Sequence, residues 1–169
     1  MDWAQFAVQW LHVLCGVFWF GGTLYVNFVA IPALRRARPE QAREVTRHLN
    51  RQGERVLVPV ALATIALGFL RGTVFGPVQS VEFLFGTAYG WTWLFGLTAA
   101  IATLAWGSRV LVPAANRLVD DDAAWTTTAD GKPTPEAQAA VAPVVRIALL
   151  ELVGFAAIFT AMILMRFGL

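Results

Sequence analysis

The chain has 169 residues, of which 57% are hydrophobic and only 14% are charged, and its mean hydropathy is +0.60. Soluble domains average about 25% charged residues, so this composition indicates one integral membrane domain in a lipid bilayer. The formal charge of +2 hides a strong local asymmetry, so it says little about nucleic-acid binding, but the chain has no nucleic-acid motif and nucleic acid is not an expected partner. A single cysteine, Cys15, excludes an internal disulfide.

Four stretches are apolar enough for a spanning helix, which needs about 20 mostly apolar residues. They cover about 6–34, 56–75, 89–112 and 143–165. We expect an all-α bundle of four transmembrane helices in a single domain, 1–169, with loops at 35–55 and 113–142. The N-terminal stretch has no basic segment before its apolar run, so it predicts a true span and not a cleaved signal peptide.

The arginines predict the orientation of the bundle, because positively charged loops are retained on the cytoplasmic side. More than half of the 13 basic residues lie between the first two spans, at Arg35, Arg36, Arg38, Arg43, Arg47, Arg51 and Arg55. We expect a protein of the cytoplasmic membrane with both loops in the cytoplasm and both termini outside. The acidic residues at 120–122 either are solvated or lie against the arginine loop.

The two halves of the chain resemble each other at the ends of their helices. "IPALRR" closes the first span and "VPAANR" the third, while "LVPVALATIALGF" in the second matches "VAPVVRIALLELVGF" in the fourth. The matches predict two related helix pairs, forming a parallel repeat about an axis along the membrane normal. Chance similarity between apolar segments is the alternative interpretation.

The first span carries a stripe of small and polar residues at spacings of three or four. Its members are His12, Cys15, Gly16, Trp19 and Gly22 or Thr23. Such a stripe usually faces the bundle interior, where glycines let a helix or a flat cofactor approach the backbone. Ionisable residues inside a membrane are costly and often functional, so His12 is the main candidate for a site. The alternative is that the glycines only pack and that His12 makes one interhelical hydrogen bond.

Other ligand-type side chains are expected at the depth of His12. Met162 and Met165 lie at the outer end of the fourth span, and Arg71 lies at the outer end of the second. One hypothesis is a b-type haem with His12 as axial ligand, a methionine opposite, and Arg71 near a propionate. Gly16 and Trp19 belong to the same expected cofactor site.

A second hypothesis uses the same region for copper. His12, Cys15, Met162 and Met165 form a soft ligand set that suits Cu(I). Without a cofactor, the methionines fill gaps and the arginine anchors the helix at the interface. His48, in the arginine loop on the opposite side of the membrane, is expected on the surface of a helical extension and cannot be a second ligand.

A second polar cluster is expected near the inner surface, formed by Asn27, Arg109, Arg146 and Glu151. Glu151 lies about two turns into an apolar helix, where a bare carboxylate is costly. We therefore expect it to pair with Arg109 or Arg146, or to be protonated. The structural interpretation is an ion pair that stabilises the bundle, and the functional interpretation is a role in a proton relay.

The segment "QWLHVLCGVFWFGGTLYVNF" resembles the first helix of a group of small four-helix membrane proteins. The group comprises the copper-resistance CopD-like family, the HemJ-type protoporphyrinogen oxidases and the membrane domain of bacterial cytochrome-linked urate oxidases. The shared feature is a histidine followed seven residues later by tryptophan and then glycine, here His12, Trp19, Gly21 and Gly22. "YGWTWLFG" is similar to the third helix of the urate oxidase membrane domain. The resemblance implies that His12 is a haem ligand or a copper-site residue.

Two features depart from the group. The resemblance to HemJ-type enzymes implies a lysine on the third helix, where this chain has Trp93, Leu94 and Phe95, and the chain contains no CxxCH haem-attachment motif. We expect a haem-b-binding redox or electron-transfer component that serves a redox partner protein or membrane complex. The alternatives are a Cu(I)-handling protein of copper resistance or transport, and a structural membrane subunit without a cofactor.

No nucleophile sits beside a base and an orienting acid, so a hydrolase is not expected; any enzyme activity would be that of a haem-dependent oxidoreductase. An oligomer is compatible with the sequence.

Overall fold

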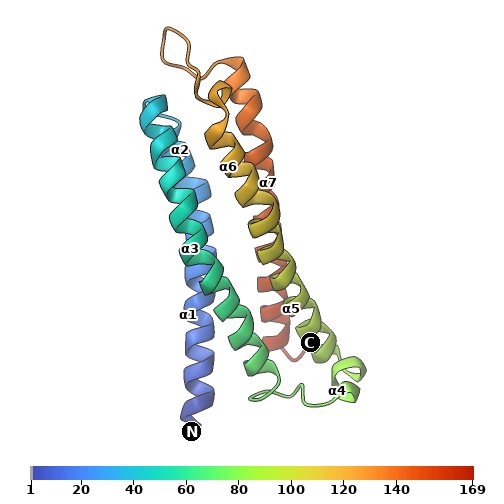
Figure 1. The fold of residues 1–169 in the computed structure, drawn as a ribbon. Coiled ribbons are helices and arrows are strands. Elements are labelled where there is room, and N and C mark those ends of the chain that lie inside the picture. The colour runs from blue at the N-terminus through green and yellow to red at the C-terminus, as the bar shows by residue number, and fades with distance from the viewer. Residues whose placement is uncertain (1) are drawn as a thin grey trace. The chain divides into compact units, whose positions relative to one another are not determined.

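The structure is a computed structural model that describes residues 2–169. It is all-α, and four long helical segments dominate it (Figure 1). They cover Trp3–Leu34, Pro39–Gly72, Ala88–Asp120 and Pro135–Arg166. Each segment is long and apolar enough to cross a membrane, so the prediction of a bundle of four membrane-spanning helices is confirmed.

The first segment consists of α1 (Trp3–Tyr25), a π-helical turn η1 (Val26–Ala30) and α2 (Ile31–Leu34), and the second is α3 (Pro39–Gly72). The short α4 (Val81–Gly86) precedes the third segment, which is α5 (Ala88–Trp106), a second π-helical turn η2 (Gly107–Leu111) and α6 (Val112–Asp120). A 3₁₀ turn, η3 (Asp122–Trp125), leads to α7 (Pro135–Arg166).

The helices extend well beyond the apolar stretches found in the sequence. α3 begins at Pro39, so most of the expected 35–55 loop is helix, and α7 begins at Pro135 instead of 143. Hydropathy detects only the part of a helix that lies in lipid. The added residues are rich in alanine, glutamate, glutamine and arginine, which favour helix in water. Proline is also well tolerated at the first helical position, where no N–H donor is needed.

The two halves share the same local breaks. A single π-helical turn interrupts the first span before Pro32 and the third span before Pro113. The second and fourth spans each contain an internal proline, Pro59 and Pro143. Because π turns are rare, their presence before "IPAL" and before "VPAA" supports the predicted relation between the two helix pairs.

The chain divides into two compact units, each built from parts of all four segments. The first unit comprises 1–20, 59–104 and 153–169, and the second comprises 21–58 and 105–152. In the first unit the helices contact one another in a closed ring. The contacts are Gly16 with Thr64, Gly72 with Trp93, Gly96 with Ala161, and Trp19 with Phe155.

In the second unit, side chains also join neighbouring helices. Leu57 of α3 packs on Gly22 of α1, and a methyl group added at Gly22 would lie 3.0 Å from its Cδ2. The indole Nε1 of Trp106 donates to the carbonyl of Ile147 on α7 at 3.0 Å. α3 and α6 are joined by a hydrogen bond from Asn50 Nδ2 to Asn116 Oδ1 at 3.1 Å.

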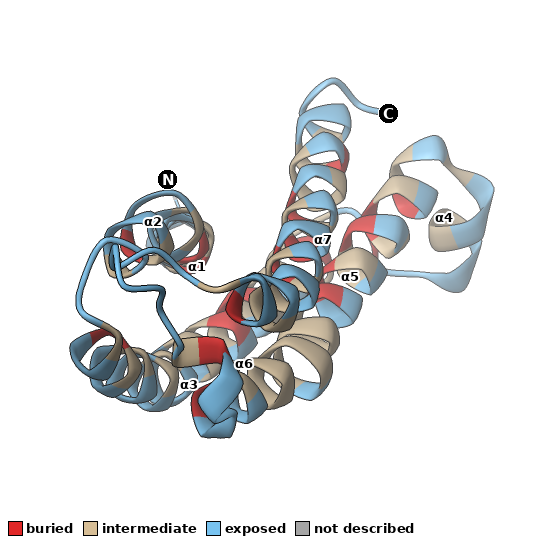
Figure 2. Ribbon diagram, turned by 90° about the horizontal axis from the view of Figure 1, so that it is seen from above, coloured by how far each residue is buried: buried red, intermediate tan, exposed pale blue. Residues whose placement is uncertain are grey.

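The helices pack through small residues and expose large apolar ones. Ala61 and Ala161 are completely buried, whereas Phe18, Phe28 and Val153 are more than half exposed. Figure 2 shows that buried positions are sparse along every long helix. Close packing through small side chains is typical of membrane helices, and the apolar exterior fits a lipid bilayer. The protein is therefore described as an integral membrane protein.

Candidate functional site

His12 lies on α1 and is bound to α3 by its ring. Its Nδ1 is 2.9 Å from the carbonyl oxygen of Thr64. Because a carbonyl can only accept a hydrogen bond, Nδ1 carries the proton and donates it. The other ring nitrogen, Nε2, is then an unprotonated acceptor, and within residues 2–169 it has no hydrogen-bond partner. The half-buried imidazole thus keeps one nitrogen free for a ligand.

Gly68 makes the close approach of this ring possible. A Cβ added at Gly68 would lie 2.9 Å from His12 Cε1 and 3.3 Å from Nδ1. At Gly16, on the stripe of the first span, an added Cβ would meet Thr64 Cγ2 at an ordinary 3.7 Å. The glycine that the site requires is therefore on α3, where sequence analysis did not place it. The available signal was the small pair Thr64 and Gly68, four residues apart on one helix face.

Arg71 lies on α3 and bonds to α1, the helix that carries His12, and its role near a haem propionate stays a prediction. Its Nε donates to Gln9 Oε1 at 2.9 Å, and its Nη1 donates to the carbonyl of Phe75 at 3.1 Å. Gln5 Nε2 donates to the same carbonyl at 3.2 Å. Gln9 and His12 are three residues apart, so they share one face of α1. The two glutamines are members of this polar face that sequence analysis missed.

Two tryptophans are buried between the helices of this unit. Trp19 is 5% exposed and packs edge-on against Phe155 with ring centroids 4.9 Å apart. Trp19 therefore faces the interior, as expected. Trp93 is buried and lies directly over Gly72, where no side chain could fit. This residue occupies the region where the resemblance to HemJ-type enzymes implied a lysine.

The methionines have their own neighbours. Met165 Cε lies 4.0 Å from the position of a Cβ at Gly96 on α5, whereas the ring of His12 lies against α3. Met162, Met165 and Cys15 are all half-buried. A methionine opposite His12 across a cofactor stays a prediction. In the described part of the chain, no three His, Cys, Asp or Glu side chains are placed to hold a metal ion.

Of the two expectations for Glu151, an ion pair with Arg109 or Arg146 is not found among the residues described, and a protonated carboxyl group stays a prediction. Glu151 is 8% exposed, and its Oε1 lies against Gly107, where an added Cβ would be 2.7 Å away. Arg109 and Arg146 are exposed, and neither forms an ion pair with Glu151 among the residues described. Asn27 donates to the carbonyl of Thr23 in its own helix at 2.9 Å. The polar cluster predicted near the inner surface is therefore not held together by an ion pair of Glu151, and the hydrogen bond of Asn27 stays within its own helix.

An ion pair does form between the arginine-rich segment at 35–55, called the arginine segment below, and the acidic residues that follow α6. Arg43 Nη1 lies 2.7 Å from Asp122 Oδ1, and Arg43 Nε donates to the carbonyl of Val119 at 2.7 Å. Of the two alternatives for the acidic residues at 120–122, contact with the arginine segment is thus confirmed for Asp122.

Comparison of the chain with protein-family models, with curated proteins and with solved structures gives no match. The resemblance to the CopD-like, HemJ-type and urate oxidase group stays an expectation carried by the residues around His12. The function therefore has to be inferred from the chemistry of the His12 site.

Proposed function

We propose that this protein is a haem-b-binding redox or electron-transfer component of the membrane. The observation that carries the proposal is the bond from His12 Nδ1 to the Thr64 carbonyl, with Nε2 left unpartnered in the described chain. A metal-binding histidine almost always donates its second ring N–H to a carboxylate, a carbonyl or water. This bond fixes the tautomer and makes the free nitrogen a better ligand.

The residues fit one axial haem ligand and one propionate partner. His12 would hold the iron through Nε2, while Thr64 and Gly68 hold its ring in place. A guanidinium has five N–H donors, and the two bonds of Arg71 leave others free for a carboxylate at the same end of the helices. When bound, a haem held in this way supplies one-electron transfer, with a potential set by its axial ligands and surroundings.

The rest of the site would keep water from the cofactor and connect it to a partner. Trp19 and Trp93 are buried large side chains in the same unit as His12. An electron-transfer component needs a donor and an acceptor, so a redox partner protein or membrane complex belongs to the proposal. The arginine segment is proposed to face the cytoplasm, with both termini outside.

The test is the haem and copper content of protein purified from cells supplied with both. Wild-type protein is expected to carry haem, and His12→Ala is expected to lose it. His48→Ala is the matched control, because His48 is exposed and its Nδ1 bonds the Glu44 carbonyl within its own helix at 2.9 Å. Copper that disappears in His12→Ala would favour Cu(I) handling instead. Protein with neither haem nor copper would favour a structural subunit and refute the proposal.

A further inference from the structure

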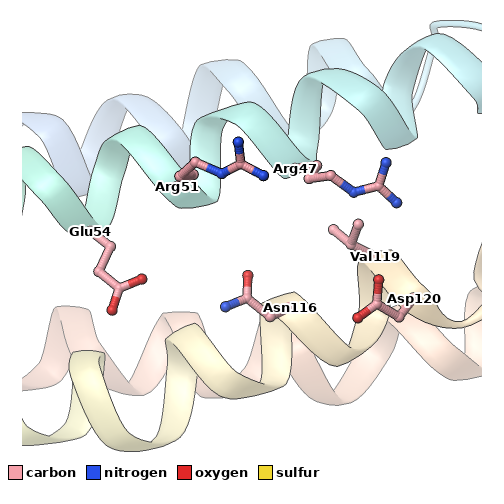
Figure 3. Close-up of a pocket in the computed structure, with 6 residues that line it drawn as sticks. All are labelled: Arg47, Arg51, Glu54, Asn116, Val119 and Asp120. Carbon is pink, nitrogen blue, oxygen red and sulfur yellow. The ribbon is translucent and has the colours of Figure 1, made fainter.

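A polar pocket opens between α3 and α6 in the second unit, whereas His12 belongs to the first unit. Its volume is about 360 Å³, within the range of small-ligand pockets. Figure 3 shows that one wall comes from α3 and the other from α6. The lining residues are Arg47, Arg51, Glu54, Asn116, Val119 and Asp120.

The charged side chains of the pocket have no partners within residues 2–169. Arg47, Arg51, Glu54 and Asp120 form no hydrogen bond or ion pair with any residue that the structure describes. Arg43, one turn before Arg47, is by contrast bound by two acceptors. The pocket therefore holds two unpaired guanidinium groups and two unpaired carboxylates.

The walls of the pocket are fixed at two places beside these groups. Arg43 bonds the Val119 carbonyl and Asp122, each at 2.7 Å. The Asn50–Asn116 hydrogen bond ties the same two helices about two helical turns further along α3. Because both ties join α3 to α6, the spacing of the two walls does not depend on the charged lining residues.

One end of the pocket lies at the depth expected for lipid headgroups. The apolar part of α3 begins at Val56. At 1.5 Å per residue, Glu54 lies roughly 3 Å, Arg51 roughly 8 Å and Arg47 roughly 14 Å beyond that boundary. The headgroup layer is about 5–8 Å thick on each side of the hydrocarbon core. Glu54 is thus inside this layer, Arg51 is at its outer edge, and Arg47 lies beyond it.

We propose that this pocket binds the headgroup of a zwitterionic phospholipid that carries both a phosphodiester and a primary ammonium group. Arginine pairs well with phosphate oxygens, so Arg47 and Arg51 take the phosphate. In Figure 3, Glu54 lies at one end of the pocket and Asp120 at the other, so a carboxylate at either end can accept from the single ammonium of the headgroup. The four charges sum to zero, so a zwitterion is matched while an anionic headgroup without an ammonium meets two repelling carboxylates.

The experiment is native mass spectrometry of the protein equilibrated with an equimolar mixture of phosphatidylethanolamine, phosphatidylcholine and phosphatidylglycerol. We expect phosphatidylethanolamine adducts to exceed phosphatidylglycerol adducts about tenfold, the factor equivalent to about 1.4 kcal/mol, typical of one hydrogen bond. Phosphatidylcholine, whose ammonium has no N–H, is expected to bind more weakly than phosphatidylethanolamine. Equal binding of phosphatidylethanolamine and phosphatidylglycerol by the wild-type protein, or a preference for phosphatidylglycerol, would overturn the proposal.

Two double variants and one control variant test whether the lipid binds in this pocket. Arg47→Gln with Arg51→Gln is expected to lose the adducts. Glu54→Gln with Asp120→Asn is expected to reverse the preference toward phosphatidylglycerol.

The matched control is Arg36→Gln with Arg55→Gln, two exposed arginines of the same segment that do not line the pocket. This control variant is expected to bind the lipid like wild type. An equal loss of adducts in the control would show that binding depends only on general surface charge, and it would overturn the proposal. Soluble phosphoethanolamine distinguishes a membrane lipid from a free headgroup. If it displaces phosphatidylethanolamine when added at the same concentration as the lipid, the assignment to a membrane lipid is overturned. None of these outcomes depends on haem.

Discussion

Replacing Gly68 by alanine would place a methyl group on the surface of α3 against which the His12 ring lies. The new Cβ would be 2.9 Å from His12 Cε1 and 3.3 Å from Nδ1, so the ring would have to move. Glycine to alanine in a helix normally stabilises by about 0.5–1 kcal/mol, whereas overpacking costs about 1–3 kcal/mol. We expect Gly68→Ala to lower the free energy of unfolding by about 1 kcal/mol.

A double-mutant cycle with His12→Ala isolates this contact. Without the imidazole ring, Gly68→Ala is expected to stabilise by about 0.5–1 kcal/mol, so the coupling energy is about 1.5–2 kcal/mol. Gly21→Ala is the control, since a Cβ there meets nothing within 4 Å. The assay is reversible denaturant unfolding in detergent, followed by circular dichroism. A Gly68→Ala variant as stabilised as Gly21→Ala, or a coupling below about 0.5 kcal/mol, would refute the reasoning.

Three further predictions concern the packing and the charges outside the His12 contact. Trp93→Ala is expected to destabilise by about 3–5 kcal/mol in the same assay, because the indole fills the space over Gly72. Glu151→Leu is expected to stabilise by about 1–3 kcal/mol, since a buried group without an ion pair is replaced by an apolar one; a comparable loss would indicate that the carboxyl group has a stabilising partner. Asp122→Asn is expected to cost at most about 1 kcal/mol, and less in 1 M salt, because its ion pair with Arg43 is exposed on the Asp122 side; a larger or salt-independent cost would contradict this.

The sequence predicted the membrane-spanning helices because lipid requires long apolar runs, and such runs are visible without any knowledge of packing. It also predicted the inward direction of Trp19 from helical periodicity. Gly68 was missed because its role depends on which helix packs against His12, and on the relative height of the two helices. Neither quantity is encoded in the periodicity of a single segment.

The absence of an ion pair between Glu151 and either arginine, among the residues described, has a geometric cause. Depth along a helix can be counted from the sequence, but depth alone does not bring two side chains together. Arg146 precedes Glu151 by five residues, which turns it by about 140° around α7 at 3.6 residues per turn. Arg109 lies two residues after Gly107, and residues at that spacing do not share a helix face. These spacings place neither arginine on the helix face where Glu151 and Gly107 meet.

The most direct test of the central claim is the reduced-minus-oxidised absorption spectrum of His12→Gly, recorded with and without added imidazole. We predict that wild-type protein shows a b-type haem spectrum, that His12→Gly loses it, and that free imidazole restores it by taking the place of the missing ring. A haem spectrum unchanged by His12→Gly, or a wild-type protein from haem-replete cells that carries no haem, would contradict the assignment of His12 as an axial ligand.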